Sequence, residues 1–186
     1  MSDARRFWIG VVSRSHVERG VAGGFLQLNH GKRAPVQKLA AGDGVAIYSP
    51  RIAYPDGAPL QAFTAIGTVA TGAIYQVQMA PDFTPYRVDV RWAACREAPI
   101  APLIAVLGFI RDKTHWGAAF RFGQLRIEAG DFRVIAEAMG CPALADGAAP
   151  PDAAEAVQAT ADKPSTARSG ATHSARARRS RTTSKL

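Results

Sequence analysis

The chain has 186 residues, a net charge of +8 and a pI near 10.1. Its length and its 47% hydrophobic content predict one folded domain with an appendage. Two distant cysteines, Cys95 and Cys141, and the lack of a signal peptide or a long apolar run argue against a disulfide-rich secreted protein and a membrane protein. We therefore expect a cytoplasmic chain with reduced thiols, and its positive charge favours a nucleic-acid partner.

Short apolar runs separated by glycine and proline turns predict small elements along most of the chain. Short runs of β-branched and aromatic residues are typical of strands, whereas apolar residues at every third or fourth position are typical of helices. In chain order, we expect a strand over 7–13, a helix over 16–21, a basic connector over 32–39, a turn over 42–44, strands over 45–48, 63–71, 73–79 and 86–92, a helix over 99–110, a strand over 122–127 and a helix over 131–139.

Single residues set several of these boundaries. Ser13 or Ser15 is expected to cap the first helix, and Asp131 the last one. Pro50 is expected to stop the strand over 45–48, because proline has no N–H to donate to a sheet. Gly72 predicts a bend or bulge between two strands.

Together these elements predict a mainly β fold with short helices, arranged as a closed barrel-like sheet and not as a doubly wound one. We expect the folded domain to span residues 5–142. Residues 143–186 are rich in Ala and Pro and then in Arg and Ser, and residues 163–186 hold seven Lys or Arg and no acid. This composition predicts a disordered basic tail.

The chain ends in Ser184-Lys185-Leu186, which matches a peroxisomal address. The Ala- and Arg-heavy composition is instead typical of a bacterial protein, in which this address has no reader. The sequence leaves open whether the match has a function.

Several segments, in one order, resemble the EVE domain, a member of the PUA-like superfamily and a relative of the YTH and SRA base-reading domains. The segments that carry the resemblance are 7–13, 23–32, 42–50 and 115–139. The resemblance implies a PUA-like barrel over the folded part of the chain. It also implies a pocket that takes a modified nucleobase flipped out of its stack.

Aromatic and uncharged polar side chains would form such a pocket, because a flat neutral base is held by stacking and by hydrogen bonds. Phe25 and Trp116, which lie in the resemblance segments beside or near glycines, are expected to be the stacking walls. For Ser13 a helix-capping role and for Asn29 a turn-forming role remain open. The full set expected at the pocket is Ser13, Phe25, Gln27, Asn29, His30, Tyr48, Trp116, Arg121 and Phe122.

Basic residues around the pocket are expected to bind phosphates without regard to base sequence. Arg121 differs from the others because it lies between two phenylalanines in the sequence. The expected phosphate contacts are Arg14, Lys32, Arg33, Arg51 and Lys113.

Sequence motifs for catalysis are missing. The histidines and cysteines have no metal-ligand spacing, and neither a GxSxG motif, a phosphate-binding glycine loop nor a deaminase HxE…PCxxC pattern occurs. We expect no catalytic residue, no metal and no cofactor, and a monomer. The resemblance to the EVE domain implies a module that reads modified cytosine or adenine in DNA. The alternatives are an RNA-binding PUA-like module for tRNA or rRNA, and a small-molecule-binding or hydrolytic enzyme that uses the same pocket.

Overall fold

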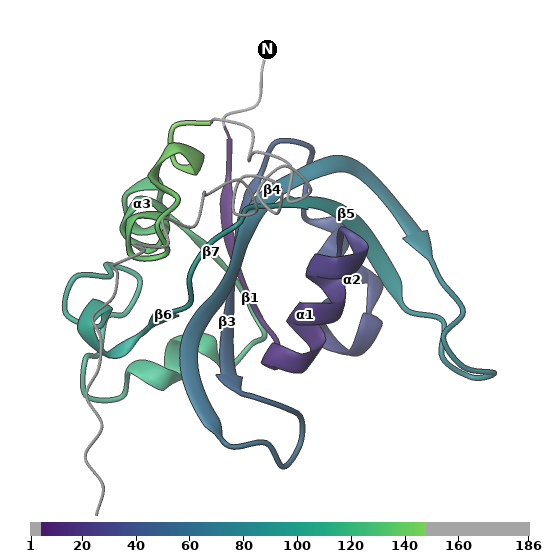
Figure 1. Cartoon of the computed structure of the whole chain (residues 1–186), viewed down its shortest axis with the longest axis horizontal. Helices are drawn as coiled ribbons and strands as arrows, with labels where there is room; N and C mark the ends of the chain where they lie inside the picture. The colour runs from purple at the N-terminus through teal and green to yellow at the C-terminus, as the bar shows by residue number, and fades with distance from the viewer. Residues whose placement is uncertain (1–4, 148–186) are drawn as a thin grey trace, which may run out of the picture.

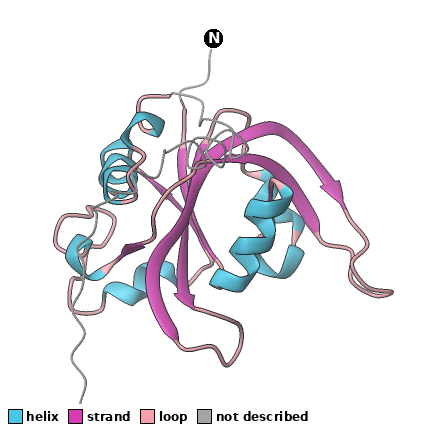
Figure 2. Ribbon diagram, in the orientation of Figure 1, coloured by secondary structure: helices cyan, strands magenta, loops and turns pink. Residues whose placement is uncertain are grey.

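A curved mixed sheet with helices on both faces makes up residues 5–147, the part of the chain that the computed structural model describes (Figures 1 and 2). In Figure 1, α1 and α2 lie under the arch of β4 and β5, and α3 lies on the opposite side. In chain order the elements are β1 (Phe7–Val11), α1 (Arg14–Gly23), β2 (Phe25–Leu26), η1 (Asn29–Gly31), α2 (Arg33–Gln37), β3 (Gly44–Arg51), β4 (Pro59–Gln76), β5 (Tyr86–Trp92), β6 (Ala98–Pro99), η2 (Ala101–Leu103), η3 (Trp116–Phe120), β7 (Gln124–Ile127), α3 (Ala129–Ala138) and η4 (Pro142–Leu144), where η marks a 3₁₀ turn.

The sheet has the strand order β2-β5-β4-β3-β1-β7, and β6 pairs with β4. β1 and β3 run parallel, whereas the other pairs are antiparallel. Within residues 5–147 the end strands β2 and β7 do not pair with each other, so the barrel-like wall has an open seam. The predicted class, mainly β with short helices, is confirmed.

Two apolar cores lie on the two faces of this wall, and β1 contributes to both. Phe7 and Ile9 pack in the core on the α3 side, and Trp8 packs in the core that contains residues of α1 and α2. Side chains alternate between faces along a strand, so only an unbroken apolar run can supply both cores. The apolar run that forms β1, near the start of the sequence, has this property.

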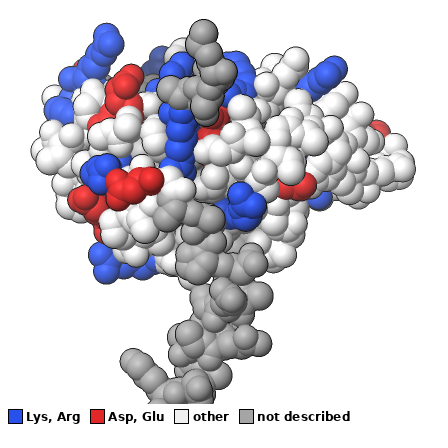
Figure 3. Space-filling view, turned by 90° about the horizontal axis from the view of Figure 1, so that it is seen from above, with Lys and Arg blue, Asp and Glu red and all other residues white. Residues whose placement is uncertain are grey.

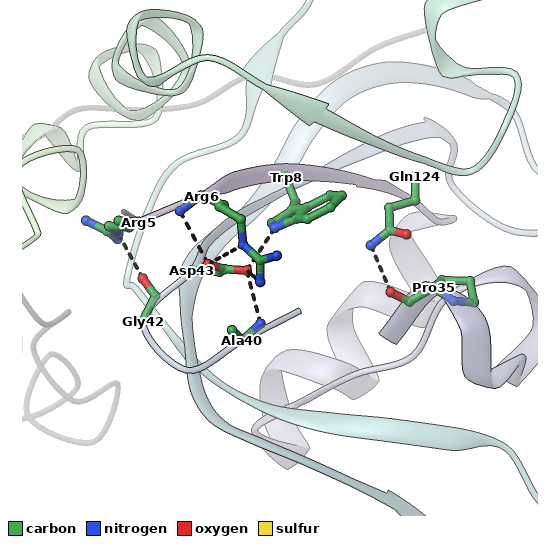
Figure 4. Close-up of polar contacts among 8 residues, drawn as sticks. All are labelled: Arg5, Arg6, Trp8, Pro35, Ala40, Gly42, Asp43 and Gln124. Atoms are coloured by element: carbon green, nitrogen blue, oxygen red, sulfur yellow. Dashed lines mark hydrogen bonds and ion pairs between the residues drawn. The ribbon is translucent and has the colours of Figure 1, made fainter. Parts of the chain in front are cut away.

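A buried carboxylate holds the turn before β3 against β1 (Figure 4). Asp43 accepts hydrogen bonds from the indole Nε1 of Trp8 at 2.9 Å, from the guanidinium Nη2 of Arg6 at 2.9 Å and from the backbone N of Ala40 at 3.0 Å. Several donors, one of them cationic, compensate for the lost hydration of the carboxylate. The start of β3 is thereby fixed beside the start of β1.

The expected connector over 32–39 is wrong, because α2 lies there. Pro35 and Val36 are buried, and Gln124 of β7 donates its Nε2 to the carbonyl oxygen of Pro35 at 3.1 Å (Figure 4). A proline in the first turn of a helix costs no hydrogen bond, so Pro35 is compatible with this helix.

The expected helix over 99–110 is also wrong, because only the 3₁₀ turn η2 forms there, followed by turns. The carboxylate of Asp131 accepts hydrogen bonds from the backbone N of Gly108 at 2.6 Å and of Phe109 at 3.1 Å. The expected cap is also wrong, since Glu128 is the N-cap residue of α3 and Asp131 lies within the first turn of the helix. Asp131 therefore ties the 104–110 segment to α3.

Most strand boundaries differ from the prediction: β1 ends at Val11 and not at residue 13, and β7 begins at Gln124 and not at residue 122. β3 continues through Pro50 to Arg51, but Pro50 has no partner in the ladder with β4, which shifts register between Ser49 and Arg51, as fits a residue without an N–H. β4 passes without a break through Gly72, and the bulge predicted there occurs as a register shift between Val69 and Ile74. β5 has the predicted limits.

The folded part extends beyond the predicted boundary at residue 142. Leu144 is buried and its carbonyl oxygen accepts a hydrogen bond from Arg5 Nη1 at 2.7 Å, while Asp146 pairs with Arg133 at 2.8 Å. The disorder predicted for the rest of the tail lies outside the described residues. Among residues 5–147, no helix is both long and apolar enough to cross a bilayer.

Candidate functional site

A pocket of about 820 Å³ opens where the ends of several strands and loops meet. The segments that line it are the end of β1 with the start of α1, the chain around η1, the β3–β4 loop, the β4–β5 hairpin and the turn before β7. Its lining residues are Val11, Val12, Ser13, Ser15, His16, Arg19, Gln27, Asn29, His30, Lys32, Pro50, Arg51, Ala53, Tyr54, Met79, Phe83, Phe120, Arg121, Phe122 and Gly123.

The pocket contains most of the residues that the sequence predicted. Segments that are distant in the chain supply them, since the β1–α1 junction, the η1 region and the turn before β7 each contribute at least one. The predicted residues that line it are Ser13, Gln27, Asn29, His30, Arg121 and Phe122 from the base-binding set, and Lys32 and Arg51 from the phosphate set.

Three predicted aromatics lie outside this pocket, among them Phe25 and Trp116, the two expected stacking walls. Phe25 is buried, with the guanidinium of Arg87 at 3.7 Å from its ring centroid. Tyr48 is 3% exposed and stacks on Phe120 at 4.0 Å, and burial raises its pKa to about 12. Trp116 packs edge-on against both rings, at 6.5 and 6.3 Å, as part of the same core.

Phe122, from the predicted set, and three residues outside that set supply exposed apolar surface in the pocket. Phe122 is 81% exposed, Tyr54 is 74% exposed, and Phe83 and Met79 are also exposed. The sequence did not single out Tyr54, Phe83 or Met79, because they lie in an insertion-like loop and at the tip of a hairpin. An exposed aromatic in a loop rich in Pro and Gly is the signal that would have identified Tyr54.

The chain at η1 has an unusual backbone. Asn29 and His30 have positive φ angles of 45° and 57°, followed by Gly31 at 78°. The turn-forming role left open for Asn29 is therefore correct. The ring of His30 lies edge-on to Tyr54 at 5.7 Å, so the turn directs His30 toward the β3–β4 loop. Such strained residues persist only where their surroundings hold them, and they cluster at ligand sites.

Gln27 is the most buried of the predicted polar residues, with 4% of its surface exposed. Its side-chain oxygen accepts a hydrogen bond from Arg87 Nε at 3.2 Å. Ser13 occupies the N-cap position of α1, but its hydroxyl caps no backbone N–H and lies 3.5 Å from that of Ser15. The hydroxyl of Ser13 is thus available to a ligand.

His16, which sequence reasoning did not select, lines the pocket beside Gln27. Burial lowers its pKa from the ordinary value of 6.5, and the positive charges of Arg19 and Arg87 lower it further. Its Nε2 is sealed from solvent and has no hydrogen-bond partner among the described residues. His16 is therefore uncharged at neutral pH.

The pocket carries positive charge without any negative charge in its described lining. The basic side chains that line it are Arg19, Lys32, Arg51 and Arg121, and none of the lining residues is Asp or Glu. On the face seen in Figure 3, by contrast, basic and acidic residues are interspersed, and the end that carries the β4–β5 hairpin is largely uncharged. A concave site of one charge sign attracts an anionic ligand.

The other predicted phosphate contacts lie outside the pocket lining. Arg14 pairs with Glu97 and with Glu18, so its charge is partly neutralised. The guanidinium of Arg33 lies over the ring of Tyr86. Lys113 donates to the carbonyl oxygen of Leu107 at 2.7 Å, which ties it to its own loop. Their role as phosphate contacts stays a prediction that the pocket lining does not support.

Comparison with known proteins identifies relatives of the whole folded part. A family model described as the EVE domain matches residues 6–138. A UPF0310 protein of Mycolicibacterium vanbaalenii is 56% identical over 135 residues, which cover 73% of this chain and 93% of that protein. The UPF0310 protein YdcG of Bacillus subtilis is 50% identical over 134 residues, which cover 72% and 92%. A UPF0310 protein of Streptococcus mutans is 40% identical over 134 residues, which cover 72% and 96%.

Proposed function

The chain belongs to the EVE domain family, and we propose that it binds nucleic acid by taking one modified base, extruded from its stack, into the pocket described above. The observation that carries this proposal is the convergence of exposed aromatic rings, uncharged polar groups and unpaired positive charge on one hollow. DNA carrying a modified cytosine or adenine is the proposed ligand.

Aromatic surface in the pocket supports a flat ligand. Phe122 and Tyr54 are largely exposed although they are apolar rings, and they come from separate segments on the pocket wall. Stacking of a base on an aromatic side chain contributes about 1–3 kcal/mol. The pocket volume of about 820 Å³ lies within the range of ligand sites and leaves room for the sugar beside the base.

The polar groups of the pocket suit an uncharged heterocycle held by a charged backbone. Gln27, Asn29, His30 and Ser13 provide donors and acceptors without a fixed charge. Arg51 and Arg121, with the two other lining cations, are the proposed phosphate contacts, and Arg51 also donates from Nη1 to the carbonyl oxygen of Gly57 at 2.9 Å. Base edges are read by hydrogen bonds, whereas phosphate contacts position the strand.

Selection of a modified base follows from the size of the added group. A methyl or hydroxymethyl group adds apolar contact, and a pocket discriminates one such group by about 1–3 kcal/mol. Met79 and Phe83 supply apolar surface on the pocket wall for this contact.

We also propose that the protein is a binding module and not an enzyme. The hydroxyls of Ser13 and Ser15 lie 3.5 Å apart, the described lining contains no carboxylate, and among residues 5–147 neither hydroxyl bonds to the lining histidines His16 and His30. Nucleophilic catalysis requires a hydroxyl or thiol beside a group that removes its proton.

The test is the affinity of the full chain for matched DNA and RNA oligonucleotides, single- and double-stranded, that differ at one position. That position carries cytosine, adenine, or either base with an added methyl or hydroxymethyl group. We expect at least about tenfold tighter binding of one modified base than of its parent, which is about 1.4 kcal/mol. Equal affinity for all oligonucleotides would contradict the proposal, and preference for one RNA irrespective of modification would support the RNA-binding alternative. Release of a hydrolysed product would support the enzyme alternative.

A further inference from the structure

Arg87 of β5 lies behind the pocket wall and contacts two of its lining residues. Its Nε donates to Gln27 Oε1 at 3.2 Å, and its Nη2 donates to Met79 Sδ at 2.9 Å. Its guanidinium carbon lies 3.7 Å from the ring centroid of Phe25, so the ring supports the guanidinium from one face. Three contacts in different directions restrict the position of this side chain.

The contact between Arg87 and Gln27 determines which end of the amide faces the pocket. A guanidinium has donors and no acceptor, so only the amide oxygen of Gln27 makes a favourable contact with it. The amide nitrogen then lies on the other branch of the amide. Among residues 5–147 it has no acceptor, and it is not one of the side-chain atoms that are sealed from solvent without a partner. Gln27 lines this pocket and a second hollow of only about 10 Å³, so the larger pocket is the one that can hold a ligand to accept from its N–H groups.

Building on the proposed function, we propose that Arg87 is a positioning residue that holds Gln27 as a hydrogen-bond donor, so that the pocket selects a base edge with an acceptor at this point. The selected group is a ring nitrogen or a carbonyl oxygen. A base with an amino group at the same place would displace water and set donor against donor, leaving polar groups without partners, and such mismatches are costly.

In this arrangement Phe25 has a different role from the base-stacking role that its position in the sequence suggested. Its ring stacks on Arg87 and not on a base, and through Arg87 it acts on Gln27. A lysine at position 87 would not replace the arginine, because an ammonium lacks the planar fork that stacks on the ring while it donates to Gln27.

The test uses the full chain and the oligonucleotide that binds best in the panel described above, with a set of analogues that each lack one acceptor of the selected base. In each analogue a ring nitrogen is replaced by C–H or a carbonyl oxygen is removed. We expect the wild type to bind one analogue about tenfold more weakly than the parent base. Gln27→Glu keeps the pairing with Arg87 but has no N–H, so it should bind the parent more weakly and should no longer distinguish it from that analogue.

Arg87→Met keeps an unbranched side chain over Phe25 but removes the donors, which frees the amide to turn. The tenfold discrimination should fall to less than about threefold, because either end of the amide then faces the ligand. Arg91→Met is the matched control, since Arg91 is an exposed arginine on the same strand, and it should discriminate like the wild type.

The outcomes separate this inference from the proposed function. A wild type that prefers no base overturns both. A wild type that prefers one base, with Gln27→Glu and Arg87→Met preferring it to the same degree, overturns only the role of Arg87. Melting temperatures identify a misfolded Arg87→Met protein, in which case the result for Gln27→Glu decides.

Discussion

Phe120 and Phe122 lie two residues apart but have opposite surroundings. Both residues line the pocket, but Phe120 is buried and stacks on Tyr48 at 4.0 Å, whereas Phe122 is 81% exposed. The turn that ends in Gly123, with a φ of 76°, separates them. One ring therefore belongs to the core, and the other is free to contact a ligand.

Phe122→Ala should weaken binding of the preferred oligonucleotide by about 1–3 kcal/mol, because a stacking surface is lost. The melting temperature should change little, since the ring buries almost nothing in the free protein. Phe120→Ala is the control and should lower the free energy of unfolding by about 3–5 kcal/mol. Calorimetric binding and thermal unfolding measure the two effects, and a large loss of stability in Phe122→Ala would show that this ring is a core residue.

His16 should make the folded state less stable in mild acid. Its pKa is lowered in the folded protein by burial and by the nearby charges of Arg19, Arg87 and His30, whereas in the unfolded chain it returns to about 6.5. The unfolded state then binds more protons, so stability rises with pH across the window between the folded pKa and 6.5. The contribution is complete above 6.5 and is lost as pH falls below it.

Urea unfolding of the wild type and His16→Gln at several pH values tests this expectation. The variant has no titrating group at this position, so its free energy of unfolding should fall less between about pH 7 and about pH 5. The same pH dependence in both proteins would mean that His16 titrates alike in the folded and unfolded states.

At the residue scale, sequence predicted polar pocket residues better than aromatic ones. Gln27, Asn29 and His30 lie in one short segment around a turn, so placing one at the pocket places its neighbours there too. For an aromatic residue, sequence does not show whether the ring packs inward. Trp116 and Tyr48 face a core that only the pairing of β3 with β4 and the position of η3 create.

At the scale of elements, the η1 turn is the piece of backbone that shapes the pocket. Gly31 has a φ of 78°, and a methyl group on it would collide with Pro85 at the start of β5. Gly42, in the turn before β3, has a φ of 87° but no atom within 4 Å of the place where a Cβ would lie. A substitution of Gly42 therefore tests backbone strain alone, whereas a substitution of Gly31 tests strain and collision together.

Gly42→Ala should cost about 1–2 kcal/mol of unfolding free energy, which is the strain of a left-handed alanine. Gly31→Ala should cost more, because the collision adds to the strain, and it should also weaken oligonucleotide binding as Asn29 and His30 move. Chemical denaturation and binding assays on both variants test this. Equal stability losses with binding unchanged would mean that η1 is not held against Pro85.

The pattern of apolar residues in the sequence predicted the elements that are regularly apolar on one face or on both. It did not predict the segments whose structure depends on contacts with residues distant in the sequence. The alternation over residues 86–92 gave the limits of β5 directly. In contrast, α2 forms in a basic segment because Pro35 and Val36 find a buried site. The 104–110 segment is not helical, because Asp131 binds the backbone N–H of Gly108 and Phe109. Both the buried site that holds α2 and the carboxylate of Asp131 come from segments that are distant in the sequence.

At the scale of the whole molecule, we expect the folded part to supply selectivity and the basic tail to supply affinity. Residues 163–186 hold seven Lys or Arg and no acid. Truncation after Gly147 should therefore reduce the slope of log affinity against log salt concentration, by up to about 0.9 for each tail cation that contacts a phosphate of duplex DNA. The preference for a modified base should persist, and its disappearance on truncation would place recognition outside the pocket.

The central claim, that one base enters the pocket, is tested most directly by a crystal structure of the full chain bound to its preferred oligonucleotide. We expect the modified base to lie out of its stack, in contact with Phe122 and Tyr54, with an acceptor on its edge within hydrogen-bond distance of the Gln27 amide nitrogen. Phosphates beside it should contact Arg51 or Arg121. A base that remains stacked in the nucleic acid, with the pocket unoccupied and the strand bound on another surface, would contradict the account.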